Sequence, residues 1–207
     1  MKSTAEKREE DLGSFHSWLM NAVQKGPVAV VTGKNGDMDT VGSAIALASS
    51  HPRLMACGLH LGRVAKKMVL HHQAPFRKLN ANYRSWPKDL AGIVIVDAAA
   101  ESQTGLNLPD VPKCILDHHA TNDWELNDVD LFLQWEVKAT TELISDYLFL
   151  YSTSTLTPEV CEFLIAGLIT DTGRFRHANH SSFSIAGKLI QHSEMDYQSF
   201  IEFLEKE

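Results

Sequence analysis

The 207-residue chain has few of the features that mark secreted or membrane proteins. Its three cysteines, Cys57, Cys114 and Cys161, show no C-x-x-C spacing and lie in apolar contexts. They are predicted to be small buried side chains in a reducing compartment. No apolar run approaches the roughly 18 residues of a membrane span, and the charged segment 1–10 lacks the apolar core of a signal peptide. We therefore expect a soluble cytoplasmic protein that has no membrane partner.

Positive charge is also scarce. The chain has 19 Lys and Arg against 26 Asp and Glu, a formal net charge of -7. Such a protein does not attract nucleic acid through its overall field, so a nucleic-acid substrate would need a local basic patch. The dense basic stretch is either a solvated helix face or a patch that contacts phosphates. It consists of Arg63, Lys66, Lys67, Arg77 and Lys78.

The apolar pattern predicts helices alternating with short, continuously apolar strands. A helix is expected over about 4–24, ended by Gly26-Pro27, and a helix over 41–50 has Asp39 or Thr40 as its expected N-cap. Further helices are predicted at 61–72, 140–150, 158–169, 182–191 and 197–205, and strands at 28–31, 54–59, 92–96 and 114–116. This alternation predicts a three-layer α/β/α, Rossmann-like fold, with a mostly parallel sheet and helices on both faces. One domain over 1–207 is the simplest organisation, with its N-terminal helix inside 1–26.

Acidic and histidine residues recur in four motifs, three of which directly follow apolar runs. In a parallel sheet, ligands gather beyond the carboxyl ends of the strands. The motifs are Gly36-Asp37-Met38-Asp39-Thr40, Asp97 after Ile93–Val96, Asp117-His118-His119 after Cys114–Leu116, and Leu168–Phe175 with Asp171. We expect these side chains to lie near one another.

Carboxylates together with an imidazole are ligands suited to hard divalent metals, including Mn²⁺. Two metals about 3.5–4 Å apart need a bridging carboxylate with further acidic ligands around it, and they activate water for attack at a phosphoryl centre. Asp37 and Asp39 would each reach one metal, and Asp97 suits the bridge. His118 and Asp171 would complete the second metal's ligands, and Asp117 would orient the His118 imidazole.

These segments resemble the DHH phosphoesterase superfamily, which includes RecJ-type exonucleases, oligoribonucleases that degrade very short RNA and pAp, cyclic-dinucleotide phosphodiesterases and family II inorganic pyrophosphatases. The first motif is Asp37-Met38-Asp39 followed by Val41–Ala44, the second Asp97 and the third Asp117-His118-His119. The fourth, Thr170–Phe175, is most similar to the oligoribonuclease branch. The match keeps the order of the motifs from about Val28 to the C-terminus.

The resemblance implies a two-Mn²⁺ site, with Mg²⁺ or Co²⁺ as possible substitutes. Asp37 would bind the first metal, Asp39 the second, and Asp97 both. His118 and Asp171 would also bind the second metal. His119 would contact the scissile phosphate, and Arg174 and Arg176 are candidate substrate-binding residues.

The chain departs from the family in two places. A metal-binding His usually stands four residues before the first Asp, where this chain has Gly33, so we expect a weak first metal. The smaller C-terminal substrate-binding domain of the family is also missing, because the chain ends at Glu207, about where its linker would start. Either this is a stand-alone catalytic domain or a fragment, and a homodimer mate or a second chain would then complete the cleft.

Three functions remain open. The first is a Mn²⁺-dependent phosphoesterase acting on short oligonucleotides or nucleotides such as pAp, in the manner of an exonuclease or oligoribonuclease. The second is a non-catalytic binding or assembly module on the same fold, which the substitution at Gly33 and the missing domain would explain. The third is an inorganic pyrophosphatase, because Lys34-Asn35 resembles the first motif of that branch.

Overall fold

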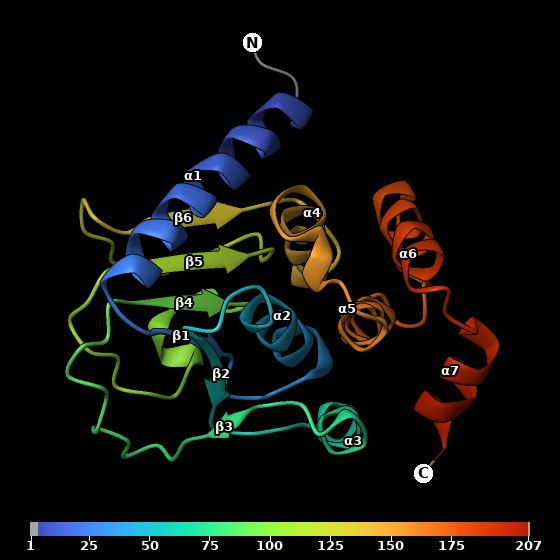
Figure 1. Cartoon of the computed structure of the whole chain (residues 1–207), viewed down its shortest axis with the longest axis horizontal. Coiled ribbons are helices and arrows are strands. Elements are labelled where there is room, and N and C mark those ends of the chain that lie inside the picture. Colours follow the sequence, from blue (N-terminus) through green and yellow to red (C-terminus); the bar gives the residue numbers. More distant parts are fainter. Residues whose placement is uncertain (1–3, 207) are drawn as a thin grey trace.

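A six-stranded, fully parallel sheet forms the centre of the protein (Figure 1). The structure is a computed structural model that describes residues 4–206. The strand order across the sheet is β3-β2-β1-β4-β5-β6. The strands are β1 (Val28–Thr32), β2 (Leu54–Gly58), β3 (Arg77–Lys78), β4 (Gly92–Val96), β5 (Lys113–Asp117) and β6 (Leu131–Gln134). The predicted α/β class with a parallel sheet is confirmed.

Seven α-helices and two short 3₁₀ helices are found among the described residues. The α-helices are α1 (Thr4–Lys25), α2 (Met38–Ala48), α3 (Arg63–His72), α4 (Thr140–Tyr151), α5 (Pro158–Asp171), α6 (His180–Ser193) and α7 (Tyr197–Glu205). The 3₁₀ helices are η1 (Glu101–Gln103) and η2 (Thr153–Thr155). No described helix is long and apolar enough to cross a membrane.

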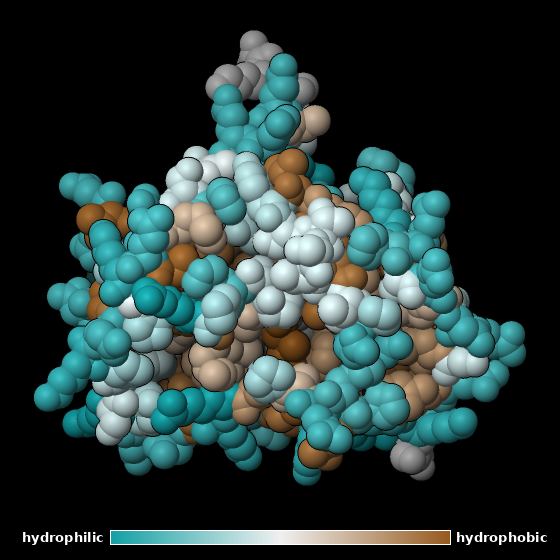
Figure 2. Space-filling view, viewed as in Figure 1, coloured by the Kyte–Doolittle hydropathy of each residue, from teal (hydrophilic) through white to brown (hydrophobic). Residues whose placement is uncertain are grey.

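The two faces of the sheet are covered unequally. All seven α-helices contribute side chains to one large apolar core, which packs on one face with Phe15, Leu47 and Ile144 among its fully buried members. The opposite core is smaller and is closed by η1 and loops, with Leu79 and Leu106 packed on the sheet. This second covering layer is thinner than the expected full layer of helices. In Figure 2 the rim of the visible face is mostly hydrophilic, and apolar patches lie nearer its middle.

Most predicted elements are present, with ends shifted by a few residues. The expected N-cap of the second helix was wrong: Asp37 is the N-cap of α2 and accepts a hydrogen bond from the Thr40 amide at 3.1 Å. The strands β3 and β6 were missed. β3 has only two residues, both charged, and so gives no apolar run, whereas β6 has the run Leu131–Leu133 and was overlooked. The cysteines are buried and unpaired, as predicted.

The order of strands creates a switch point between β1 and β4. The chain leaves β1 through α2 toward β2 on one side and leaves β4 through η1 toward β5 on the other. In open parallel sheets, ligands bind where neighbouring connections diverge in this way. Asp37 follows β1 and Asp97 follows β4, so two of the four acidic motifs begin at this point.

Candidate metal and phosphate site

A cavity of about 410 Å³ opens at the carboxyl ends of the central strands. All four sequence motifs contribute to its wall. The lining residues are Gly33, Lys34, Asn35, Asp37, Asp97, Gln103, His118, His119 and Asp171. The structure therefore brings together the predicted site residues Asp37, Asp97, His118, His119 and Asp171, with Asp39 buried directly behind His118.

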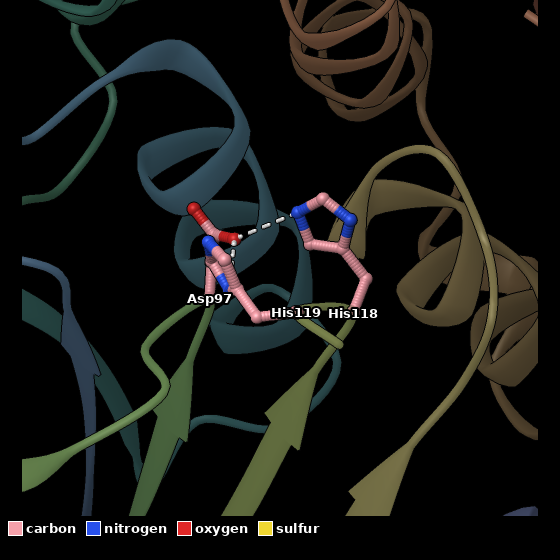
Figure 3. A group of neighbouring side chains, drawn as sticks. All are labelled: Asp97, His118 and His119. Carbon is pink, nitrogen blue, oxygen red and sulfur yellow. Dashed lines mark ion pairs between the residues drawn. The ribbon is translucent and has the colours of Figure 1, made fainter. Parts of the chain in front are cut away.

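His118 is the centre of one half of this cavity. Its Nε2 atom lies 3.3 Å from Asp97 Oδ1, 3.4 Å from Asp171 Oδ2 and 3.9 Å from Asp39 Oδ2. Figure 3 shows the imidazole directed at the Asp97 carboxylate from the end of the neighbouring strand. Carboxylates from the ends of α5, α2 and β4 thus meet one ring nitrogen.

Protonation of these groups reflects their crowding. Burial raises the pKa of Asp39 well above its usual range, and the charges of Asp97 and Asp171 raise it further. Burial also raises the pKa of Asp171, to about 6, with the charge of Asp97 as the next cause. For His118, burial lowers the pKa, but the hydrogen bond to Asp97 and the surrounding carboxylates outweigh it and raise the pKa to about 9. The cluster therefore has a strong demand for positive charge.

Asp39 is held by the beginning of α4. It is completely buried, and it accepts hydrogen bonds from the backbone amides of Thr140 at 2.7 Å and Thr141 at 2.9 Å. The N-cap of α4 is Ala139, which has no side-chain acceptor, so Asp39 satisfies amides that the helix leaves free. Gly167 of α5 lets that helix come close, because a Cβ there would lie 3.1 Å from the Asp39 Cα.

Asp97 has an unusual backbone. Its φ angle is 59°, in the left-handed region that few non-glycine residues adopt. This conformation turns the carboxylate back over the strand end, where Oδ1 accepts a hydrogen bond from the Thr140 hydroxyl at 3.3 Å. Burial raises the pKa of Asp97. A strained residue at the carboxyl end of a central strand is typical of a functional site.

Asp117 contacts a different histidine from the one predicted. Its Oδ1 lies 2.7 Å from His119 Nδ1, so Asp117 orients His119 and the prediction that it orients His118 was wrong. The reason is the position of Asp117 inside β5, which directs its side chain to the same face as the second histidine. His118 Nδ1 instead lies 3.4 Å from the Val137 carbonyl. His119 keeps 44% of its side-chain surface exposed, which leaves its ring accessible to a ligand.

Asp37 lies in the other half of the cavity and is occupied by local hydrogen bonds. Its Oδ1 caps α2, and its Oδ2 accepts a hydrogen bond from Asn35 Nδ2 at 2.6 Å. Among the described residues, two groups of side chains are close enough to hold a metal, and both use His118. They are Asp39/His118/Asp171 and Asp97/His118/His119.

The donor set fits one divalent metal well. Oxygen atoms of Asp39, Asp97 and Asp171 converge on His118 Nε2, and a mixed carboxylate and imidazole set suits Mn²⁺ and similar ions. His119 fits this role less well, because its Nδ1 is already paired with Asp117. The first-metal position fits a metal less well. Gly33 offers no donor atom, and Asp37 is the one carboxylate of the cavity lining that belongs to neither His118 group.

Arg174 and Arg176 do not line this cavity. They lie in a neighbouring groove of about 660 Å³ together with Arg63, and Arg174 Nη1 pairs with Glu205 Oε1 at 3.2 Å. The turn that carries them is strained, with φ near 60° at both Arg174 and Phe175. Within the basic stretch, Lys67 does not face substrate, because its ammonium donates to carbonyl oxygens at the end of α7.

Three groups that contact or line the site were not predicted from the sequence. Thr140 holds both Asp39 and Asp97, and a pair of threonines at a predicted helix start was the available signal for an anion-binding N-terminus. Gln103 and the Val137 carbonyl carried no signal, since they come from segments without a motif.

Two solved structures share the fold of this chain. An exopolyphosphatase-related protein from Bacteroides fragilis is 17% identical, with a TM-score of 0.77 over 95% of this chain and 60% of that one. A putative family II inorganic pyrophosphatase from Methanococcus jannaschii is 20% identical, with a TM-score of 0.66 over 85% of this chain and 60% of that one. The chain thus spans about 60% of the length of either relative.

These distant structures show the fold but do not assign the chain to a family; a family model does. The model described as the DHH family, N-terminal domain, matches residues 27–168, from the start of β1 to the last turn of α5. That range contains three of the four motifs and ends three residues before Asp171. The chain belongs to the DHH family.

Proposed function

We propose that this protein is a metal-dependent phosphoesterase that hydrolyses a small phosphorylated substrate. The observation that carries the proposal is the convergence of Asp39, Asp97 and Asp171 on His118 Nε2 at 3.3–3.9 Å, beside an accessible His119. A buried group of carboxylates is unfavourable unless a cation compensates it. Membership of the DHH family and the phosphate-handling relatives support the reaction class.

The residues have separate tasks in this proposal. Asp39, Asp97, His118 and Asp171 would hold a divalent metal, with Mn²⁺ as the proposed ion and Mg²⁺ or Co²⁺ as substitutes. The metal would polarise a phosphoryl oxygen and make a water molecule more acidic. Asp117 fixes the His119 tautomer with the proton on Nδ1, and His119 Nε2 is then the ring atom available to a substrate phosphate.

We propose a short oligonucleotide or a nucleotide such as pAp as the substrate. A cavity of about 410 Å³ lies in the range of small-ligand sites, roughly 300–1,000 Å³. It accommodates a phosphate group with part of a nucleotide. Arg174 and Arg176 would contact a more distant phosphate of a longer substrate, because Asp171 of the cavity and Arg174 of the groove are three residues apart.

The test is hydrolysis by the purified chain with Mn²⁺, Mg²⁺ or Co²⁺, on a panel of dinucleotides, pAp, cyclic dinucleotides and pyrophosphate. We expect Mn²⁺-dependent release of a nucleotide or phosphate, and its loss in Asp97→Asn. Asparagine keeps the shape of Asp97 and tolerates its left-handed backbone. The control Asp89→Asn lies on an exposed loop before the opposite end of β4. Activity that survives Asp97→Asn would contradict the proposal.

A pyrophosphatase is the second candidate. Lys34 and Asn35, which resemble the pyrophosphatase motif, both line the cavity. Faster hydrolysis of pyrophosphate than of every nucleotide in the panel would select this activity. A protein that binds the metal but hydrolyses nothing would instead be a binding or assembly module on the DHH fold.

A further inference from the structure

The half of the cavity around Asp37 is not built like a metal site. Gly33 contributes no ligand, and Asp37 belongs to neither of the two groups of described side chains that lie close enough together to hold a metal. A Cβ at Gly33 would lie 3.1 Å from Asn35 Oδ1 and 3.3 Å from the Asp97 carbonyl oxygen. Asn35 therefore fills space beside Asp37 that a metal and a further ligand would need.

A cation of the chain itself lies in this half. Lys34 is exposed and lines the cavity beside Asp37 and Asp97. Of the described residues that line the cavity, it is the only lysine or arginine. Among the ion pairs found between described residues, none involves Lys34, so its ammonium is available to a ligand.

The position of Lys34 is fixed by its surroundings. Its backbone amide donates to the Gln103 carbonyl at 2.7 Å, and the Gln103 side chain in turn accepts from the Ala99 amide at 2.8 Å. Its stem passes over Gly105, where a Cβ would lie 3.3 Å from the Lys34 Cβ and only 2.6 Å from Leu59 Cδ1. A larger residue at 105 would thus push the stem away. The loop after β4 holds this lysine at the mouth of the cavity.

The Lys34 ammonium offsets part of the negative charge of the cavity. With one divalent metal bound, the four carboxylates of Asp37, Asp39, Asp97 and Asp171 leave the site with two net negative charges. A phosphate dianion would be repelled from such a site. The Lys34 ammonium halves that excess and brings donors that bind phosphate oxygens as a point charge.

We propose that Lys34 replaces the first metal: the site binds one divalent metal at the His118 half, and the Lys34 ammonium binds a non-bridging oxygen of the substrate phosphate at the Asp37 half. This inference rests on the proposed function, because it assumes that the cavity receives a phosphoryl group. It identifies the substrate class as a phosphate monoester or diester whose charge is shared between one metal and one lysine.

The first test measures the affinity of the Mn²⁺-loaded full chain for inorganic phosphate by calorimetry. Lys34→Gln should weaken phosphate binding by about tenfold or more, the usual range for a lost charge-assisted hydrogen bond, without weakening Mn²⁺ binding. Lys88→Gln is the matched control, since it removes the same charge from an exposed loop near the other end of the sheet. Equal phosphate affinity in the wild type and Lys34→Gln would overturn the proposal.

The second test counts metals. The wild type should bind one Mn²⁺ per chain and show no spin-coupled signal in electron paramagnetic resonance. The double variant Gly33→His/Asn35→Ala supplies a ligand and removes the obstructing amide, so it should bind two. Two coupled Mn²⁺ ions in the wild type, or a single ion in a folded double variant, would contradict the proposal. Neither measurement needs turnover, so a protein that passes both and hydrolyses nothing would refute the proposed function and leave the one-metal site standing.

Discussion

The cavity has two halves that are built differently. Around His118, three carboxylates are crowded together and largely removed from water, at 0%, 7% and 32% side-chain exposure for Asp39, Asp97 and Asp171. Around Asp37, each carboxylate oxygen has a hydrogen-bond donor from its own loop, and an exposed lysine stands beside it. The first half brings three carboxylates to one imidazole, whereas the second half has one carboxylate and a lysine that lines the same cavity.

The contrast shows how a loop with the right residues differs from a metal site. Asp37 and Asp39 are two residues apart, yet Asp39 is directed toward the His118 cluster and Asp37 caps α2. What separates them is the first turn of the helix, which directs the two side chains to opposite sides. Spacing in the sequence predicts that both carboxylates lie near the cavity, but only the fold shows that Asp39 is the one grouped with His118.

The largest effect is expected from removing the centre of the metal half. His118→Ala should abolish tight Mn²⁺ binding and lower hydrolysis by at least about a hundredfold, because even residues that only orient metal ligands commonly contribute 10–100-fold. Unchanged Mn²⁺ affinity in His118→Ala would contradict the proposed role of His118 as a metal ligand. His180→Ala, an exposed histidine at the start of α6, is the control for loss of an imidazole.

A smaller loss is expected from the residue that faces the substrate rather than the metal. His119→Ala should lower kcat by about 10–100-fold, the usual range for a residue that assists proton transfer or orients the reacting group. The number of bound Mn²⁺ ions should stay the same, because the proposed ligands are Asp39, Asp97, His118 and Asp171, and His119 Nδ1 is paired with Asp117. Steady-state kinetics with calorimetry on the same sample separates the two effects. Loss of the metal in His119→Ala would instead identify His119 as a metal ligand.

The metal half should also make the metal-free protein sensitive to pH. The folded pKa of Asp171 is raised to about 6 and that of His118 to about 9. Both protonated forms are therefore favoured by folding, and this stabilisation is lost as the pH rises through each folded pKa. The melting temperature without metal should fall between about pH 4 and pH 9, and Asp171→Asn should remove the part of the fall between about pH 4 and pH 6. Added Mn²⁺ should stabilise most at the higher pH, since its ligands must be deprotonated.

The smallest effect is expected outside both halves. Arg174→Ala/Arg176→Ala should raise KM for substrates of several nucleotides by a few-fold and leave pAp hydrolysis unchanged. The reason is that both side chains line the neighbouring groove, and Arg174 is 74% exposed, where ionic contacts are weak. An equal loss on pAp would place these arginines at the catalytic cavity. Lys88→Gln again controls for loss of surface charge.

The fold was largely predictable from the chain itself. The strands β1 and β4 are buried over all five residues, and four consecutive residues of each, Val28–Val31 and Ile93–Val96, are apolar. The edge strand β3 has only two residues, Arg77 and Lys78, and carries no apolar signal, whereas the other edge strand, β6, has the apolar run Leu131–Leu133 and was overlooked. The helical covering of the second face of the sheet was overestimated, since loops rather than long helices supply Leu79 and Leu106 to the core on that face.

The site was predictable in its members and less so in its contacts. Asp97 and His118 could be placed together because the ends of neighbouring parallel strands meet at one edge. The partner of Asp117 was missed because the predicted strand ended at Leu116. With Asp117 inside β5, the alternation of side chains places it on the same face as His119. Thr140 lies more than 40 residues from Asp97 in the sequence, and only the folded chain brings its hydroxyl to that carboxylate.

The central claim, that one half of the cavity holds the metal, is tested most directly by anomalous diffraction from crystals of the full chain soaked in Mn²⁺. We expect one anomalous peak within ligand distance of His118 Nε2 and the Asp39, Asp97 and Asp171 carboxylates, with no peak beside Asp37. A second peak of similar height between Asp37 and Asp97, or a single peak away from His118, would contradict the claim.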